Sequence, residues 1–333
     1  MKRLSLSVSF FALALSLLTI VIWRGEGNTS TKIEQRQFTF SYQLNVDNIP
    51  PDAKTMEIWI PFPQNNEHQK IVDYKIKAEH SHEFYLDPDY GNKIIDFNFT
   101  EEIPEKIAVE LNYTIIRVED KSLAVDKNST TDINSPDDLK RFLEPNKLVP
   151  IDGKIADEAR KVADSNMLSI EKVKAVYDYL HRTMKYDKSG EGWGQGDAVY
   201  ACDFRKGNCT DIHSLFIGML RSIGIPARFI IGFPLPEKLS ESAIAGYHCW
   251  AEFYIEDMGW VPVDISEAIK HPDKKEYFFG HLDANRVSFT TGRDIKLSNS
   301  SEQQSLNYFI YPFIQIDSKP FKEINYSFSF SQN

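Results

Sequence analysis

The stretch Gly207-Asn-Cys-Thr-Asp211 begins an amphipathic segment in which apolar side chains recur at helical spacing. Asn208 is a typical N-cap residue, because its side chain can accept hydrogen bonds from the first helical N–H groups. Gly224 and Pro226 end the pattern. The sequence therefore predicts a helix that starts beside Asn208, with Cys209 in its first turn. The apolar stripe of this helix comprises Ile212, Leu215, Phe216, Met219, Leu220 and Ile223.

Cys209 lies where a helix favours negative charge. The unpaired N–H groups and the positive end of the helix dipole stabilise a thiolate relative to a thiol. Arg205 and Lys206, just upstream, add positive charge. A nucleophilic cysteine needs such an environment. A buried core cysteine is the alternative interpretation of the same residue.

A second stretch, Gly246-Tyr-His-Cys-Trp250, begins a predicted strand. Side chains alternate along a strand, so His248 and Trp250 share one face and Cys249 lies on the other. A histidine at a strand start, downstream of a helix-start cysteine, is the layout of a nucleophile with its base. Trp250 is a candidate for shielding the imidazole, and a core tryptophan is the alternative.

The strand returns in a predicted hairpin. Residues 256–259 are typical of a turn, and residues 260–264 are typical of the return strand. A hairpin folded about Glu256 places Asp264 opposite His248, at roughly 5 Å between Cβ atoms. A carboxylate there can hold the imidazole by one ring N–H, which is the arrangement of a catalytic triad.

These residues resemble the core of the transglutaminase-like superfamily, over about residues 150 to 300. The resemblance implies a papain-like triad of Cys209, His248 and Asp264. It does not imply protein crosslinking, since members similar to this chain include hydrolases and proteins of unknown substrate. The motifs that carry the resemblance are Lys206-Gly-Asn-Cys-Thr-Asp211, Gly224-Ile-Pro-Ala-Arg228, Tyr247-His-Cys-Trp250 and Gly259-Trp-Val-Pro-Val-Asp264.

Other side chains are candidates for supporting roles. His213 lies four residues after Cys209 and is a rival base on the same helix face. Papain-like sites stabilise the oxyanion with a side-chain donor upstream of the cysteine and with the cysteine's own N–H. Trp193 and Gln195, in the glycine-rich stretch 190–196, are candidates for that donor, and a flexible loop is the alternative.

The N-terminus carries an export signal. Lys2 and Arg3 precede an apolar run from Leu4 to Trp23, and 20 residues can span a bilayer as a helix. This length favours an uncleaved anchor over a cleaved signal peptide, and the basic residues leave the bulk of the chain outside the cytoplasm. We therefore expect an exported protein on the periplasmic or extracellular side, anchored to the cytoplasmic membrane by residues 4–23.

Export affects how the three cysteines are interpreted. An odd number of thiols in an oxidising compartment fits a free nucleophile at Cys209, with or without a disulfide between Cys202 and Cys249. Zinc-type cysteine pairs are lacking, so neither a metal nor another cofactor is expected. The net charge of −10 and the absence of a basic patch argue against nucleic-acid binding.

The 333 residues are enough for two domains. Alternating apolar residues between 33 and 118 predict an antiparallel β-sandwich. The fold class expected is α+β, with a papain/transglutaminase-like catalytic core preceded by this sandwich. The expected segments are 1–32 for the anchor or signal peptide and a short linker, 33–118 for the sandwich, 119–149 for a linker, 150–300 for the catalytic domain and 301–333 for C-terminal strands.

The function predicted is that of an exported thiol enzyme acting on a peptide, protein or cell-envelope substrate. It cleaves or transfers an acyl group from a peptide or carboxamide. Hydrolysis is favoured, because water is present at ~55 M and an amine site must be built specially. Transamidation is the alternative reaction, and a non-catalytic peptide-binding module that retains the fold is the alternative class.

Overall fold

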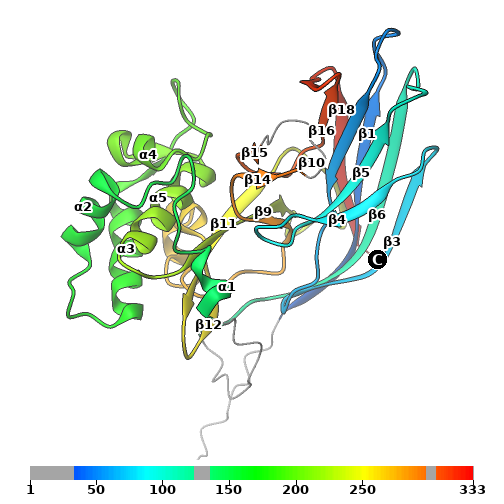
Figure 1. Cartoon of the computed structure of the whole chain (residues 1–333). Helices are drawn as coiled ribbons and strands as arrows, with labels where there is room; N and C mark the ends of the chain where they lie inside the picture. Colours follow the sequence, from blue (N-terminus) through cyan, green and yellow to red (C-terminus); the bar gives the residue numbers. More distant parts are fainter. Residues whose placement is uncertain (1–33, 124–135, 298–304, 333) are drawn as a thin grey trace, which may run out of the picture. The chain divides into compact units, whose positions relative to one another are not determined.

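The computed structural model describes residues 34–123, 136–297 and 305–332 (Figure 1). Residues 33–333 form one compact unit. The fold is α+β, as predicted. Within the described ranges no helix is long and apolar enough to cross a bilayer. The predicted anchor, residues 4–23, lies outside those ranges, and the predicted boundaries at 118 and 150 stay predictions.

Two five-stranded antiparallel sheets form the β-sandwich, in the orders β10-β18-β1-β6-β3 and β17-β16-β2-β5-β4. Alternating apolar residues of β1, such as Phe38 and Phe40, are fully buried, as their period predicts, and Phe40 packs against Phe233 and Phe289. The strands are β1 (Gln35–Val46), β2 (Met56–Pro61), β3 (Gln69–Ala78), β4 (Glu83–Leu86), β5 (Lys93–Phe99), β6 (Ile107–Val118), β10 (Glu241–Ile244), β16 (Phe313–Ile316), β17 (Lys319–Pro320) and β18 (Asn325–Gln332).

Strand β3 departs from the expected pattern. Its alternation predicted an inward apolar face, but Val72 and Tyr74 are 47% and 44% exposed. The strand lies at a sheet edge, and its pairing with β6 shifts between Ile71 and Asp73. An edge strand with a bulge turns part of its face to solvent, which explains the difference.

The sandwich is completed by distant parts of the chain. Figure 1 shows β18, from the C-terminal end, beside β1, and the register pairs Phe40 with Phe330. Strand β10, from the segment between Gly232 and His248, pairs with β18 in the same sheet. The sandwich and the predicted catalytic region are therefore joined through shared strands as well as through the chain.

The predicted catalytic core is a four-stranded antiparallel sheet, β12-β11-β9-β13, packed against helix α5. Helices α2, α3 and α4 pack on α5. The helical spacing of apolar residues in 155–163 and in 170–184 predicts two helices before Cys209, and these are α2 and α3; helix α4 is not predicted. The main elements are α2 (Gly153–Val162), α3 (Ser169–Thr183), α4 (Ala198–Phe204), α5 (Cys209–Ser222), β9 (Ala227–Pro234), β11 (His248–Ile255), β12 (Gly259–Val263), α6 (Ile265–Lys270) and β13 (Arg286–Thr291).

Short elements complete the described chain. They are α1 (Pro136–Lys140), β7 (Lys185–Tyr186), β8 (Lys206–Gly207), the 3-10 helix η1 (Pro272–Lys274), β14 (Ile295–Lys296) and β15 (Ser305–Leu306). Of these, β7 and β8 form a small parallel pair that ends just before Cys209. This pair fixes the chain that enters α5.

The hairpin of β11 and β12 has a different register from the predicted one. A fold about Glu256 would pair Tyr254 with Met258, whereas the structure pairs Tyr254 with Trp260. The prediction is wrong by two residues, because the turn takes residues 256–258 and the chain bends again at Gly259, with a φ of 73°. A shift of two keeps every side chain on its predicted face, since strand side chains alternate with a period of two.

Candidate active site

Helix α5 begins as the sequence predicts. Asn208 is its N-cap, and its side-chain oxygen accepts from Thr210 N–H at 3.0 Å and Asp211 N–H at 3.4 Å. Cys209 is the first helical residue and is only 3% exposed. The thiol therefore lies in the first turn of a capped helix, in a buried position.

Asp211 ties the glycine-rich loop to this helix. Its carboxylate accepts from the N–H groups of Gly194 at 2.7 Å, Gly196 at 2.8 Å and Asn208 at 3.0 Å. The sequence does not indicate the contacts with Gly194 and Gly196. These contacts position the loop that precedes α4 beside Cys209, and they involve backbone groups that no side-chain pattern indicates.

His248 and Asp264 lie together, as predicted from the hairpin. Nε2 of His248 is 2.7 Å from Oδ2 of Asp264. Asp264 is the N-cap of α6, and its Oδ1 accepts from the Ser266 hydroxyl at 2.9 Å and from Glu267 N–H at 3.0 Å. With both oxygens bonded, the carboxylate has a fixed orientation.

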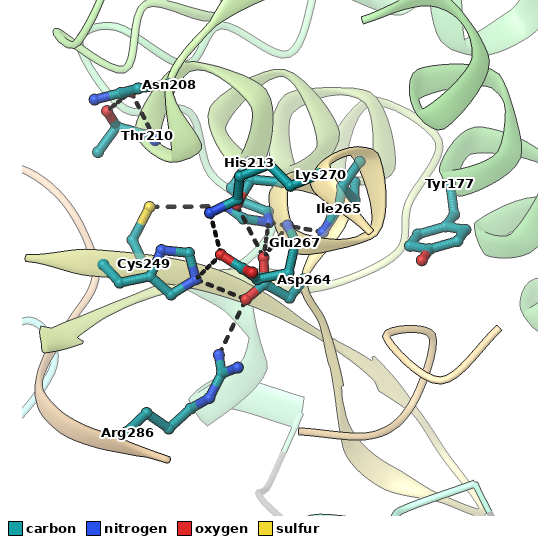
Figure 2. Close-up of polar contacts among 12 residues, drawn as sticks. Tyr177, Asn208, Thr210, His213, Cys249, Asp264, Ile265, Glu267, Lys270 and Arg286 are labelled. Atoms are coloured by element: carbon teal, nitrogen blue, oxygen red, sulfur yellow. Dashed lines mark hydrogen bonds and ion pairs between the residues drawn. The ribbon is translucent and has the colours of Figure 1, made fainter. Parts of the chain in front are cut away.

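Arg286 is a partner of Asp264 that the sequence did not indicate. It donates to Asp264 at 3.0 Å and to Asp283 at 2.9 Å, and it is 3% exposed. Figure 2 shows its guanidinium reaching the carboxylate on the side away from His213. Arg286 comes from β13, which pairs with β9 and not with the hairpin, so only the folded sheet brings it to the site.

The electrostatics of this pair favour two charged partners. Burial lowers the pKa of His248, but the Asp264 carboxylate outweighs burial and raises it to about 10. Burial opposes ionisation of Asp264, yet His248 and Arg286 hold its pKa well below the usual range. An imidazolium facing a carboxylate is therefore the stable state near neutral pH.

The pKa of Cys209 is held well below its usual range. The largest cause is a hydrogen bond from the Cys249 thiol, and a hydrogen bond and the charge of His248 act in the same direction against burial. Because Nε2 of His248 bonds to Asp264, Nδ1 is the ring nitrogen left for Cys209. The arrangement can hold a thiolate and imidazolium side by side, which is the resting state of an activated cysteine.

His213, the rival base, has different partners. It is fully buried, its Nδ1 lies 3.7 Å from the Cys249 sulfur, and its Nε2 accepts from Ile265 N–H at 3.0 Å. Its Nε2 is 3.7 Å from Asp264, beyond hydrogen-bond distance. Both ring nitrogens are thus engaged, which favours His248 as the base.

The other candidate residues lie at different places. The Trp250 ring is 6.4 Å from the His248 ring, centroid to centroid, and is almost fully buried. Trp193 donates its indole N–H to the Gly190 carbonyl at 3.1 Å, and Gln195 is exposed. The oxyanion role of Trp193 or Gln195 stays a prediction.

One group of described side chains could hold a metal ion: His248, Asp264 and Glu267 have ligand atoms within 4.8 Å of one another. Asp264 already binds the Arg286 guanidinium, however, and His248 carries its proton toward Asp264. A cation would have to displace both, so these residues fit an ion-pair network better than a metal site. The three cysteines are free thiols, and the bridge considered between Cys202 and Cys249 is not formed.

A family model and relatives from other organisms match this chain. Residues 155–265 match the model of the transglutaminase-like superfamily. An uncharacterised protein of Haemophilus influenzae is 27% identical over 345 residues, covering 90% of this chain and 92% of its own length. The uncharacterised protein YebA of Bacillus subtilis is 28% identical over 128 residues, covering 34% of this chain and 17% of its own.

A solved structure supports the fold. A candidate cysteine protease from Cytophaga hutchinsonii matches 91% of this chain and 100% of its own, with a TM-score of 0.54 and 18% identity. At that identity the match bears on the fold and leaves the chemistry open. The matched residues 155–265 contain all the sequence motifs that carry the resemblance to the transglutaminase-like superfamily.

Proposed function

We propose that the protein is a thiol enzyme that transfers an acyl group from a peptide or carboxamide through Cys209, His248 and Asp264. One observation carries the proposal. The bond of 2.7 Å between Nε2 of His248 and Asp264 leaves the other ring nitrogen available for Cys209, a buried cysteine at a helix N-terminus. Packing alone does not explain a buried cysteine, imidazolium and carboxylate in sequence, because burying charged groups costs free energy unless they are paired.

In the first half of the reaction, the Cys209 sulfur attacks the carbonyl carbon. The new carbon–sulfur bond forms as the carbonyl π electrons move to oxygen, giving a tetrahedral oxyanion. His248 donates its Nδ1 proton to the leaving amine, the carbon–nitrogen bond breaks, and a thioester on Cys209 remains. Asp264 stays ionised throughout and holds the ring in place.

In the second half, neutral His248 takes a proton from water, and the resulting hydroxide attacks the thioester carbon. The carbon–sulfur bond breaks, the carboxylic acid leaves, and the thiolate and imidazolium return. An amine in place of water would give transamidation by the same steps. Hydrolysis is the proposed outcome, because water is always present at ~55 M.

The proposed place of action is the outer face of the cytoplasmic membrane. The support is the apolar run from Leu4 to Trp23 behind two basic residues. The substrates available there are peptides, proteins and cell-envelope polymers with amide bonds. A fusion reporter that is active only in the cytoplasm would contradict this location.

The test is a mass-spectrometric trap of an acyl adduct on Cys209. The protein is incubated with peptide and cell-envelope fractions, quenched in acid and digested, and the Cys209 peptide is searched for added mass. We expect an adduct in the unchanged protein and none in Cys209→Ala. Release of a free acid indicates hydrolysis, and release of an amide-linked product indicates transamidation. The acyl-enzyme mechanism is wrong if product forms equally in Cys209→Ala.

A further inference from the structure

Two buried side chains beside Cys209 have no part in the proposed reaction. Cys249 and His213 are fully buried, and the Cys249 sulfur lies 3.7 Å from Nδ1 of His213 (Figure 2). We propose that His213 and Cys249 form a hydrogen-bond relay that stabilises the Cys209 thiolate. The inference rests on the proposed function in one respect, that Cys209 is the nucleophile.

The backbone fixes the tautomer of His213. Ile265 N–H can only donate, and it lies 3.0 Å from Nε2 of His213, so Nε2 carries a lone pair. Burial lowers the pKa of His213, which keeps the ring neutral. A neutral ring with an accepting Nε2 has its proton on Nδ1. That proton faces the Cys249 sulfur and also the Cys209 carbonyl one turn back along α5.

Cys249 is the next donor in the relay after His213. Because its sulfur accepts from His213, its own S–H is available to donate. We assign the Cys209 thiolate as its acceptor, since Cys249 is the largest cause of the lowered pKa of Cys209. Burial raises the pKa of Cys249, so it stays a thiol when Cys209 ionises. A hydrogen bond to an ionised acceptor is stronger than one between neutral groups. Three donors in series, Ile265 N–H, His213 Nδ1–H and the Cys249 thiol, therefore end at the thiolate in this proposal and polarise one another.

Two adjacent residues at the start of β11 supply both supports. His248 and Cys249 are adjacent, so their side chains leave the strand on opposite faces. His248 meets Asp264 at one side, and Cys249 faces His213 of α5 at the other. The start of one strand thus brings a base and a thiol donor to the same nucleophile.

Several other titratable groups act on Cys209 and contribute to any pH profile. The groups are His248, His213, Asp211, Tyr186, Tyr247, Tyr308 and Tyr311. Burial raises the pKa of each of these tyrosines, so they stay neutral in the neutral range. His248 is the neighbour whose charge matters most there, and it is unchanged in the variants proposed next.

The test measures how fast iodoacetamide alkylates Cys209 as a function of pH, read on the Cys209 peptide by mass spectrometry. In Cys249→Ala, we expect the inflection to rise by about one pH unit and the rate below it to fall about tenfold, because one hydrogen bond to an ion is lost. Cys249→Ser keeps a donor at this position and is expected to retain most of the low inflection. An unshifted inflection in Cys249→Ala overturns the relay.

Three further variants guard against an effect on folding. Cys202→Ala is the matched control, since it removes another buried thiol, on α4, that has no place in the relay. His213→Asn keeps an N–H donor near the position of Nδ1, and His213→Ala removes it. We expect the larger upward shift in His213→Ala, with circular dichroism confirming that both variants fold. Equal shifts in the two variants would contradict the relay, even if Cys249→Ala failed to fold.

Failure of the relay and failure of the proposed function look different. If the unchanged protein forms the acyl adduct and alkylates with a low inflection, but Cys249→Ala does the same, only the relay is wrong. If the unchanged protein forms no adduct although the inflection is low and moves in Cys249→Ala, the relay stands and the acyl-transfer function is wrong.

Discussion

The site is built on two helix N-termini that serve opposite purposes. At the start of α5, Asn208 caps the helix and Cys209 is left as the reactive group. At the start of α6, Asp264 is itself the cap, and the first N–H, that of Ile265, bonds to His213. The N-terminus of α5 thus favours a thiolate on Cys209, which is the reactive group. The N-terminus of α6 fixes the carboxylate of Asp264, which does not react.

The largest expected effect is at the reactive end. Cys209→Ala is expected to reduce turnover at least about 10⁴-fold, because it removes the nucleophile. The fold is expected to survive, since Cys209 lies at the helix start and the packed stripe of α5 is unchanged. Turnover and circular dichroism check both expectations. Cys202→Ala is the control and should retain activity. If Cys209→Ala has comparable activity, Cys209 is not the nucleophile and the contrast between the two helix ends is lost.

The next largest effect is expected at the base. His248→Ala is expected to lower kcat at least about 10³-fold, because no group remains to carry the proton. His213→Ala is expected to cost only about tenfold, the loss of one hydrogen bond acting on the thiolate. Steady-state kinetics of His248→Ala and His213→Ala decide which histidine is the base. A larger loss in His213→Ala would make the helix-borne histidine the base.

The two helix ends also differ in how far the sequence reveals them. The start of α5 was predicted correctly because every signal is local: Asn208 as the cap, the apolar stripe and the terminal Gly224. The pairing of His248 with Asp264 was predicted although the register was wrong by two residues. The correct partner was still found because a shift of two keeps the faces, and Asp264 extends beyond β12 as a cap.

The parts that the sequence missed depend on distant contacts. Arg286 reaches Asp264 from β13, and β10 joins the sandwich sheet through β18. Strand β10 has four residues, which is too short for a periodic pattern, and Arg286 is a single charged residue at the start of β13. The sequence shows that His213 lies four residues after Cys209 but does not show the partners of its ring, since Ile265 N–H and the Cys249 sulfur belong to other elements.

A smaller effect is expected on the pH dependence of stability. Because the folded pKa of His248 is raised to about 10, its contribution is complete below its unfolded pKa of roughly 6.5 and is lost as the pH rises through about 10. Cys209 titrates in the opposite sense, so Cys209→Ala is the background to use. In that variant Asp264 still raises the pKa of His248, without the contribution of Cys209. The free energy of unfolding, from urea titrations, is therefore expected to fall as the pH rises above roughly 6.5.

The control for this measurement is the double variant Cys209→Ala with His248→Gln, which removes the titrating ring. Its free energy of unfolding is expected to be flatter over the same alkaline range. Asp264 has a depressed pKa, so its contribution is present above its unfolded pKa of roughly 3.9 and is lost only as the pH falls below it. An alkaline fall of the same size in both variants would show that other groups cause it.

The smallest effect is expected at Trp193, in the loop that Asp211 ties to α5. Trp193→Phe removes the indole N–H, which bonds to the Gly190 carbonyl at 3.1 Å and so supports the loop. We expect kcat to fall by less than about tenfold, whereas loss of an oxyanion donor costs about 10²–10³-fold. Kinetics of Trp193→Phe beside Gln195→Ala measure the difference. A loss of about 10²–10³-fold in either variant would identify that residue as the oxyanion donor. The glycine-rich loop would then be part of the site at the N-terminus of α5.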